Sequence, residues 1–460
     1  MEFNKIIKNL ESEWFKKNTN KSTNQIYVPQ IIFNKLDLKH NDTIAVEVKS
    51  KNFHETFPVR VNKITTKSGV SFSFYLPYKK YKLIQNDNLI VRIIKLKEVN
   101  EYTIKLNTHL IFIKPDQFIL TEWINQNQIV IWEKPTGYPT SRPIITGKVL
   151  DINHDILSYL GLYMADGNTI GYYKLFTSTK DIFNLAIKGY SGLIFNPVFD
   201  INIGYDKFNK DMCLNSVITK EIKAYWGDVV PNIHFVNISI STRRQNAKKR
   251  SKSHVPFGSV YIKDNRTLSR VLHTFLINSI LIKFKDNKEV LTSFFIGAAL
   301  GDFYPSIRNR NEAFNWLEIA TNKKEVPIWK DICKTLGFSC EEKIREGNRV
   351  LLCIHGYFNN IVLLKKGLFN EYTKRRNRMI DGLKNRVETY IFQRFLKSNV
   401  KVIKWEGEFL IKTNSFFIVN KGVDLVGNGL VEFDRKNVLL TNEGVKFIED
   451  LVELKILEDD

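Results

Sequence analysis

The sequence has few of the residues that build disulfide frameworks and metal clusters. Among 460 residues there are 4 cysteines, none in a Cys-x-x-Cys pair, and the 8 histidines do not gather beside them. This composition argues against a zinc site and predicts reduced, mostly buried, isolated thiols. The four are Cys213, Cys333, Cys340 and Cys353.

Long hydrophobic runs are also lacking. No apolar stretch approaches the roughly 18 to 20 residues that a membrane span needs. The N-terminal "MEFNKIIKNLESEW" has acids among its lysines and lacks the apolar core of a secretory signal. We therefore expect a cytoplasmic protein without a membrane partner.

Acidic residues are outnumbered by basic ones. The chain has 69 Lys and Arg against 48 Asp and Glu, which gives a net charge of +21. A field of this sign attracts polyanions, nucleic acid above all, although an AT-rich genome also enriches lysine. The length exceeds one compact core and predicts two to four domains.

Residues 1–115 are predicted to be rich in strands, and they contain an internal repeat. "YVPQIIFNKLDLKHNDTIAVEV" (27–48) and "YLPYKKYKLIQNDNLIVRI" (75–93) share an aromatic-apolar-Pro start, a leucine and an Asn-Asp turn. A strand with apolar residues at every second position follows in both copies. The matched residues are Pro29 and Pro77, Leu38 and Leu83, and Asn41-Asp42 and Asn86-Asp87.

This repeated segment resembles the swapped-hairpin domain of AbrB-type DNA-binding proteins, which normally work as dimers. Two copies in one chain imply a tandem AbrB-like domain over residues 1–115 that forms a single-chain pseudo-dimer. A plain β-barrel of no particular function is the alternative.

Composition predicts three more segments. Residues 116–150 include "EKPTGYPTSRPIITG", whose prolines and glycines suit a linker. Residues 151–395 alternate helical and strand-like stretches. Residues 396–460 are predicted to form a strand, a turn at Asp434–Asn437, a strand and an amphipathic helix capped by Thr441. That order resembles the wing and last helix of a winged-helix domain; a small α+β cap is the alternative.

One motif occurs twice between residues 151 and 395. "YLGLYMADG" (159–167) aligns with "FIGAALGDF" (295–303), so a glycine, a small residue and an aspartate recur at the same spacing. A single copy is typical of a helix that ends at a C-cap glycine. Two matched copies favour a functional pair. They align Gly161 with Gly297, Ala165 with Gly301, and Asp166 with Asp302.

The spacing of the small residues predicts close helix packing. Residues four apart share one helix face, and small residues there let two backbones approach. Such packing would offset the roughly 1 kcal/mol that each helix glycine costs relative to alanine. If the two helices pack together, Asp166 and Asp302 meet at their C-terminal ends.

A pair of carboxylates at two helix C-termini is electrostatically unfavourable. The helix end carries a partial negative charge, and the two acids repel each other, so they need a divalent cation, protonation or basic neighbours. Oxygen ligands favour Mg²⁺ or a similar hard ion. A metal beside a basic, DNA-binding surface suggests metal-assisted phosphodiester hydrolysis.

The motif pair resembles the LAGLIDADG family of homing endonucleases over residues 151–395, about half of the chain. "YYKLFTSTKDIFNLAIKGY" and "NWLEIATNKKEVPIWKDICKTLGFSCEEKI" are similar to the family's strand followed by a helix, and "NRVLLCIHGYFNNIVLL" to its later strand and helix. The resemblance implies an α+β fold with pseudo-two-fold symmetry. It would comprise two αββαββα-like halves (about 151–285 and 286–395), a β-rich N-terminal domain and a small winged-helix-like C-terminal domain.

The resemblance also implies residue roles. In the family, the sheets bind the major groove of double-stranded DNA, and the motif acids bind Mg²⁺ where the strands are cut. Carried over, Asp166 and Asp302 are catalytic metal ligands, and the small residues Gly161, Ala165, Gly297 and Gly301 form the helix interface. The family's polar position that orients an attacking water falls near Ser178, with Thr321 as its counterpart.

The chain departs from the family pattern in two ways. Phe303 stands where the family has a glycine after the second acid, and Pro305 follows. The basic residue at the family's active-site edge has no clear match. Lys174, which shares a strand face with Ser178, is the catalytic candidate, and Lys180 and Arg308 are further ones.

Two basic stretches are predicted to contact DNA phosphates: "RRQNAKKRSK" (243–252) and "TKRRNR" (373–378). A solvated loop and helix face are the alternative. The predicted DNA-binding residues are Arg243, Arg244, Lys248, Lys249, Arg250, Lys374, Arg375, Arg376 and Arg378.

Three functions remain open. The first is a monomeric, Mg²⁺-dependent, site-specific endonuclease of double-stranded DNA with one acid per half-site. The second is a DNA-binding regulator that has the same fold with weak or no cleavage, and the third is an RNA maturase. The presence of both acids favours the endonuclease.

Overall fold

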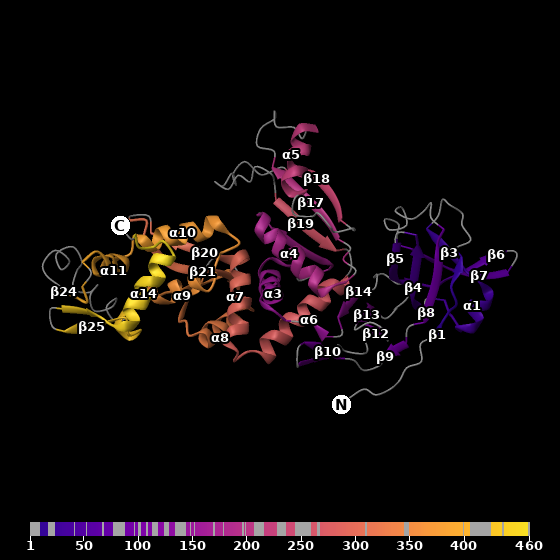
Figure 1. Cartoon of the computed structure of the whole chain (residues 1–460), viewed down its shortest axis with the longest axis horizontal. Helices are drawn as coiled ribbons and strands as arrows, with labels where there is room; N and C mark the ends of the chain where they lie inside the picture. The colour runs from indigo at the N-terminus through magenta and orange to yellow at the C-terminus, as the bar shows by residue number, and fades with distance from the viewer. Residues whose placement is uncertain are drawn as a thin grey trace. The chain divides into compact units, whose positions relative to one another are not determined.

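The computed structural model is a mixed α+β protein with several small sheets (Figure 1). It describes residues 10–16, 24–40, 42–51, 53–66, 69–76, 88–95, 97–99, 103–106, 109–112, 118–123, 128–133, 144–147, 149–150, 152–168, 171–177, 179–195, 197, 199–206, 216–227, 236–243, 259–264, 267–308, 311–344, 349–398, 400–404, 425–434 and 437–458. The chain divides into two compact units. One comprises Met1–Ile152, Asn168–Lys174 and Tyr190–Leu272, and the other Asn153–Gly167, Leu175–Gly189 and His273–Asp460.

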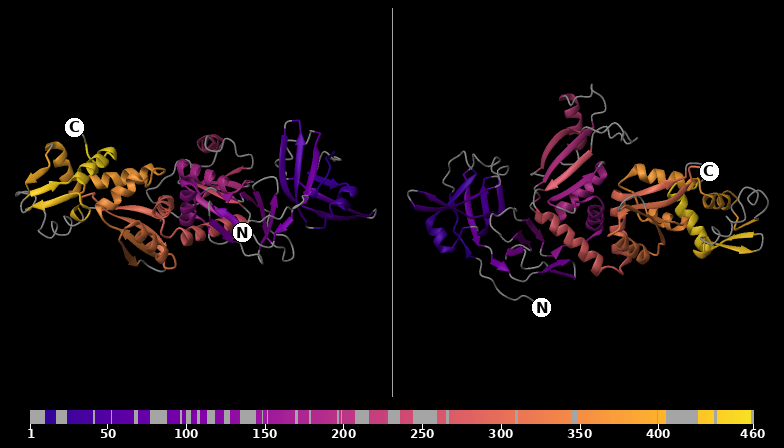
Figure 2. Two further views of the ribbon diagram at one scale, coloured as in Figure 1. Left: turned by 60° about the horizontal axis from the view of Figure 1, so that its bottom comes forward. Right: turned by 180° about the vertical axis from the view of Figure 1, so that it is seen from behind.

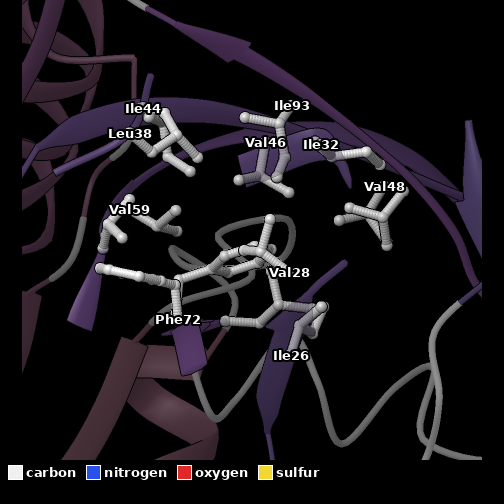
Figure 3. Close-up of a cluster of buried hydrophobic side chains, with 14 of the residues drawn as sticks. Ile26, Val28, Ile32, Leu38, Ile44, Val46, Val48, Val59, Phe72 and Ile93 are labelled. Carbon is white, nitrogen blue, oxygen red and sulfur yellow. The ribbon is translucent and has the colours of Figure 1, made fainter. Parts of the chain in front are cut away.

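Residues 10–95 form two sheets that face each other, which we call the N-terminal double sheet. One sheet has the order β1-β8-β4-β5, with β2 also paired to β8, and the other has the order β3-β7-β6. Figure 3 shows Val46, Val48 and Ile93 of the first sheet across from Ile26 and Val28 of the second. The elements are β1 (Leu10–Glu11), β2 (Phe15–Lys16), β3 (Gln25–Val28), α1 (Gln30–Lys35), β4 (Thr43–Ser50), β5 (Phe53–Arg60), β6 (Asn62–Thr66), β7 (Gly69–Tyr75) and β8 (Ile90–Lys95).

The two sequence copies pair with each other in this double sheet. Strand β4 of the first copy lies antiparallel to β8 of the second, with Val46 opposite Ile93 and Val48 opposite Val91. Glu47 and Arg92, which the alignment equates, are directly opposite each other. Such a register is what a two-fold axis through this pair produces.

The second pairing repeats this relation. Strand β3 lies antiparallel to β7, which leads into the second copy, and the equivalent residues Ile26 and Phe74 stand opposite each other. The predicted pseudo-dimeric arrangement of the copies is thus present in the strand register. Asn41 and the matched residues Pro77, Leu83, Asn86 and Asp87 lie outside the described residues.

An ion pair lies at the pseudo-two-fold axis, and a homodimer of identical copies could not form it. In a homodimer, identical residues would face each other at this position, whereas here Arg92 meets Glu47. The Arg92 Nε lies 2.8 Å from Glu47 Oε2, and its Nη1 lies 2.8 Å from Glu11 Oε2. Burial would raise the pKa of Glu47, but hydrogen bonds with His54 and Arg92 lower it below its ordinary value.

We expect Arg92→Met to destabilise the N-terminal double sheet by about 1–3 kcal/mol, because two acids would lose their shared partner. A double-mutant cycle of Arg92→Met and Glu47→Gln, measured by urea unfolding, should show an interaction free energy of at least about 0.5 kcal/mol between the two residues. Because the pKa of Glu47 is lowered, this contribution is present above the ordinary glutamate pKa and is lost as pH falls. Lys35→Met is the control, since the ion pair of Lys35 within the described residues is with the exposed Glu13; equal losses would contradict the prediction.

Part of the expected linker is a sheet. Residues 116–150 contain strands β12 (Phe118–Trp123), β13 (Gln128–Glu133), β14 (Ile144–Gly147) and β15 (Val149–Leu150). Strands β14, β13, β12 and β9 (Lys97–Val99) form one sheet in that order, and β11 (His109–Phe112), β10 (Thr103–Leu106) and β15 form another. The correction has a simple cause: "FILTEW" and "QIVIWE" are strand-forming sequences. The proline-bearing residues 134–143 lie outside the described residues.

The second predicted half has the expected order of elements. Helix α7 is followed by a strand pair, helix α8, a second strand pair and helix α9, and its sheet has the order β20-β21-β23-β22. Pro305 lies in the edge strand β20, where a missing N–H is tolerated. The elements are α7 (Lys288–Asp302), β20 (Phe303–Ile307), β21 (Phe314–Asn322), α8 (Val326–Leu336), β22 (Cys340–Ile344), β23 (Arg349–Ile354) and α9 (Tyr357–Lys365).

The first predicted half departs from that order. Its sheet, β16-β19-β17-β18, matches the second sheet if β18 is an added edge strand that runs parallel to β17. Helix α5 connects β17 to β18, as a parallel pair requires. Among the described residues the counterpart of β20 is reduced to an isolated antiparallel bridge between Gly167 and Leu175. The elements are α3 (His154–Asp166), β16 (Tyr173–Thr177), α4 (Lys180–Leu193), β17 (Phe199–Asp206), α5 (Ser216–Gly227), β18 (Val236–Arg243), β19 (Ser259–Asp264) and α6 (Thr267–Lys283).

The C-terminal residues form the predicted two strands and helix, and the two strands are antiparallel with Asp434 opposite Asn437. Thr441 caps α14, and its Oγ1 accepts a hydrogen bond from the Gly444 N–H at 2.9 Å. Phe447 of α14 packs against Phe358 and Phe392, so this segment shares a core with α9 and α11 (Figure 2). The elements are α10 (Thr373–Lys384), α11 (Val387–Ser398), β24 (Val402–Lys404), β25 (Val431–Asp434), β26 (Asn437–Leu440) and α14 (Asn442–Glu453).

Candidate functional site

The site is built on the packing of α3 along α7, the two helices that carry the repeated motif (Figure 1). A Cβ built on Gly161 would collide with the backbone oxygen of Phe294, and one on Gly297 would collide with that of Ser158. These contacts are equivalent, because the motif alignment equates Ser158 with Phe294. The predicted close, pseudo-symmetric packing of the small residues is confirmed.

The same packing brings the two acids together. Gly301 lies against Ala165. A Cβ built on Gly301 would lie 2.8 Å from the Ala165 Cβ and 2.9 Å from Asp166 Oδ2. Asp302 follows Gly301 directly and interacts electrostatically with Asp166. The predicted meeting of the acids at the helix ends is therefore confirmed.

Both acids resist ionisation in the folded chain. Burial raises the pKa of Asp166 to about 6, against a lowering by the Arg375 charge. Burial raises the pKa of Asp302 to about 7, with further increases from Asp166 and Glu325 and an opposing effect of Arg375. The Arg375 charge only partly offsets the burial of the two carboxylates, so both acids suit a role that brings a further cation to them.

Arg375 is the basic residue that sequence reasoning did not place at this site. Its Nη1 donates to the backbone oxygens of Ala299, Leu300 and Gly301 at 3.0, 3.0 and 2.8 Å. These are the free carbonyls at the C-terminal end of α7, where a cation is favoured. Its guanidinium also lies 4.5 Å from the centre of the Tyr372 ring. Arg375, predicted from its basic stretch to contact DNA phosphates, thus lies at the end of α7 beside the acid pair; its contact with DNA remains a prediction.

The two helices end in the same backbone conformation despite the glycine-to-phenylalanine difference. Gly167 has φ −78° and ψ 157°, and Phe303 has φ −95° and ψ 144°. A Cβ on Gly167 would collide with the backbone oxygen of Tyr163, to which its N–H is bonded, and with the Tyr163 ring. The equivalent residue in α7 is the small Ala299, whose oxygen bonds Arg375 instead.

Phe303 is thus accommodated by its surroundings. It begins β20 opposite Ile319 and is fully buried, with its ring 4.7 Å from that of Phe295 and 5.5 Å from that of Trp329. The phenylalanine at this position leaves the helix end, and with it Asp302, in place.

The donor set at the helix ends fits a hard divalent cation. Mg²⁺ keeps several waters and is commonly held by one or two carboxylates together with phosphate oxygens. Asp166 and Asp302 supply two such carboxylates. Among the described residues no group of three or more His, Cys, Asp or Glu side chains could hold a metal ion, so water or the oxygens of a bound ligand would complete the coordination.

The other predicted site residues fall into different settings. Ser178 lies outside the described residues. The Thr321 hydroxyl donates to Glu325 Oε2 at 3.0 Å, which links it to one of the two acids that raise the pKa of Asp302. Lys174 belongs to the other compact unit, where its Nζ lies 4.4 Å from the centre of the Tyr261 ring.

Two weaker basic candidates are placed by their elements. Lys180 begins α4. Arg308 is exposed, and its Nε donates to Asn315 Oδ1 at 3.2 Å, so it supports the turn between β20 and β21.

The predicted DNA-binding residues are only partly described. Residues 244–252 lie outside the described residues, and Arg243 ends β18. On α10, Lys374 and Arg378 are exposed, and the Arg378 guanidinium lies 4.9 Å from the centre of the Tyr304 ring. The Arg376 Nη1 is buried without a hydrogen-bond partner in the described part of the chain. One exposed basic edge of α10 therefore remains for phosphate contact.

Helix α14 has a surface of the opposite sign. Its exposed or half-exposed residues include Glu443, Glu449 and Glu453, and Asp450 is paired with Lys365. An acidic helix repels phosphates, so the resemblance of this segment to a winged-helix domain does not extend to a DNA-reading role for α14.

Two cysteines that looked isolated in sequence are neighbours. A hydrogen bond links the side chains of Cys333 in α8 and Cys340 at the start of β22. This bond raises the pKa of the buried Cys333 thiol and lowers the pKa of Cys340 to about 7. The turn at Gly337 allows the approach, because its φ of 86° is left-handed.

We expect iodoacetamide at pH 7 to modify Cys340 about tenfold faster than an ordinary thiol of pKa about 8.5, because about half of the Cys340 side chains are thiolate at this pH. Cys333→Ala should remove the stabilising donor and slow the reaction, whereas Cys353→Ala should leave it unchanged. Peptide mass spectrometry over a time course measures the rates, and equal modification in wild type and Cys333→Ala would contradict the prediction.

Searches for related proteins give no guide to this site: no protein-family model matches the chain, and no curated protein matches it significantly. Within the described part of the chain, every helix is too short or too polar to cross a membrane.

Proposed function

We propose that the protein is a site-specific, Mg²⁺-dependent endonuclease that cuts double-stranded DNA. The observation that carries this proposal is the delivery of Asp166 and Asp302 to one place by helices that pack at matched glycines. Two half-buried carboxylates at helix C-termini oppose folding. A reaction explains their presence better than a structural role.

The arrangement of elements supports the LAGLIDADG resemblance as the framework for this activity. The second half has the order helix, two strands, helix, two strands, helix, and the first sheet has a matching strand order with one added strand. The net charge of +21 suits a DNA partner. We further propose that the protein acts as a monomer, since one chain already carries both motifs.

The roles of the residues follow from their positions. Asp166 and Asp302 would hold Mg²⁺ through their carboxylate oxygens, with the remaining positions taken by water and by DNA phosphate oxygens. When bound, the ion supplies Lewis-acid activation of the phosphate and lowers the pKa of a coordinated water. The pKa of Asp302, about 7 in the metal-free chain, means that cation binding also releases protons at neutral pH.

A DNA-binding regulator is the second candidate, and one observation favours it. Arg375 already brings a positive charge to the acid pair without a metal. The chain also carries an N-terminal double sheet whose two copies pair about a pseudo-two-fold axis, a form that resembles AbrB-type DNA-binding domains. We propose AbrB-like DNA contact for this domain in either case.

Cleavage of a plasmid library tests the proposal. Wild type with Mg²⁺ should linearise a subset of plasmids that share a site, and Asp166→Asn and Asp302→Asn should not. Tight sequence-specific binding without cutting would favour the regulator. Selective protection of a structured intron RNA, without DNA cutting, would favour an RNA maturase.

A further inference from the structure

Arg375 reaches the acid pair from a helix that follows the repeated order of helix, two strands, helix, two strands and helix. It lies in the first turn of α10, which comes after α9, the helix that ends this order in the second half. The equivalent helix end in the first half is closed by the N–H of Gly167, which donates to Tyr163 O at 2.8 Å. The guanidinium is therefore an asymmetric addition to an otherwise pseudo-symmetric site.

The donors of Arg375 are used unevenly. The Nη1 makes three hydrogen bonds to the carbonyls of α7. The Nε and Nη2 donate to nothing in the described part of the chain, and no ion pair within 4.0 Å joins the guanidinium to Asp166 or Asp302. Its charge is nonetheless close enough to act on the pKa of both acids.

This combination leaves a fixed cation with a free edge. Rotation of the guanidinium is restricted by the α7 carbonyls on one side and by the Tyr372 ring, 4.5 Å away, on its face. The free Nε–Nη2 edge is the side of arginine that binds a phosphate in bidentate fashion. A phosphate that approached two carboxylates would be repelled by them, and such a cation offsets that repulsion.

We propose that Arg375 is a catalytic residue that binds a non-bridging oxygen of the scissile phosphate through Nε and Nη2. The proposal rests on the proposed endonuclease function and adds to it the residue that holds the phosphate. The contact stabilises the negative charge that grows on the phosphate oxygens during hydrolysis. Arg375 is held by carbonyls of α7 alone. The contact therefore contributes more to cleavage of the DNA strand beside Asp302 than to cleavage of the other strand.

The test measures single-turnover cleavage of each labelled strand of a duplex that carries the site recovered from the plasmid library. Arg375→Met should slow the more dependent strand by at least about 100-fold, and Arg375→Lys, which keeps the charge without the fork, by about tenfold. The matched control is Lys384→Met in the last turn of α10, where Lys384 is exposed and pairs with Glu458; this variant should stay within about twofold of wild type.

A second readout separates phosphate contact from mere support of the helix end. With Rp and Sp phosphorothioates at the scissile position, wild type should prefer one isomer, and Arg375→Lys should lose that preference. Mn²⁺ binding to the DNA-free protein, followed by electron paramagnetic resonance, should not weaken in Arg375→Lys, because the acids remain in place.

The outcomes are distinguishable. Cleavage by Arg375→Lys with wild-type rate and wild-type isomer preference, while Asp166→Asn is inactive, would overturn the role of Arg375 and leave the endonuclease intact. Mn²⁺ binding that weakens in parallel with the rate would also overturn it, since Arg375 would then only position the acids. Failure of wild type to cut any plasmid would overturn both proposals.

Discussion

Replacing Asp166 or Asp302 with asparagine is expected to lower cleavage by at least about 1,000-fold while making the folded protein more stable at neutral pH. The two effects have one cause. Each carboxylate is buried at the C-terminal end of a helix beside the other acid, so ionisation costs free energy until a cation arrives. Asparagine keeps the shape and removes the charge, together with the metal-binding oxygen.

The stability gain should be on the order of 1–2 kcal/mol for each variant, after allowance for solvent screening of the partly exposed groups. Urea unfolding with EDTA at pH 8 measures it. Asp155→Asn is the matched control, because Asp155 lies in the first turn of the same helix, where an acid is favourable. The control should lose stability, and a loss in all three variants would contradict the electrostatic explanation.

The sign of the pH dependence follows from the raised pKa values. Between the ordinary aspartate pKa of 3.8 and the folded values of about 6 and 7, the folded chain binds more protons than the unfolded one. The contribution of this pair to stability therefore declines as pH rises through that window and stays low above pH 7. Unfolding free energies between pH 5 and pH 8 should show this decline in EDTA, less of it with Mg²⁺, and least in the double asparagine variant.

The sequence was sufficient to predict the centre of the site because its evidence was repeated. Two glycine–small–aspartate motifs define which helix faces meet, and the equivalent collisions at Gly161 and Gly297 repeat that geometry. The N-terminal repeat was informative for the same reason, since equivalent residues such as Glu47 and Arg92 stand opposite each other. Local signals also sufficed for the C-terminal hairpin and for the cap at Thr441.

The missed features depend on contacts between segments far apart in the sequence. Nothing in "TKRRNR" distinguishes Arg375 from its exposed neighbours, because only the packing of α10 sends its guanidinium to the carbonyls of α7. The cysteines likewise looked unrelated until the turn at Gly337 brought Cys340 to Cys333. One signal was present in the sequence. Ala299 aligns with Tyr163, so α7 has no counterpart of the ring that a side chain at Gly167 would meet.

The largest stability loss is expected from Gly161→Ala and Gly297→Ala. An exposed helix glycine replaced by alanine usually gains up to about 1 kcal/mol. Here the added methyl would meet a backbone oxygen of the partner helix, Phe294 at one site and Ser158 at the other. The backbone cannot move aside as a side chain can, so we expect each variant to lose about 3–4 kcal/mol in the free energy of unfolding, measured with urea.

Two further glycines calibrate that prediction. Gly427 has open space around it, so Gly427→Ala should be neutral or slightly stabilising. Gly301→Ala would place its methyl 2.8 Å from the Ala165 Cβ, a side-chain contact that can adjust, and should cost about 1–2 kcal/mol. The cleavage rate should fall further than the loss of stability alone explains. The same methyl would lie 2.9 Å from Asp166 Oδ2 and displace that carboxylate. Equal losses at Gly161, Gly301 and Gly427 would show that helix propensity, and not the approach of α3 to α7, governs these positions.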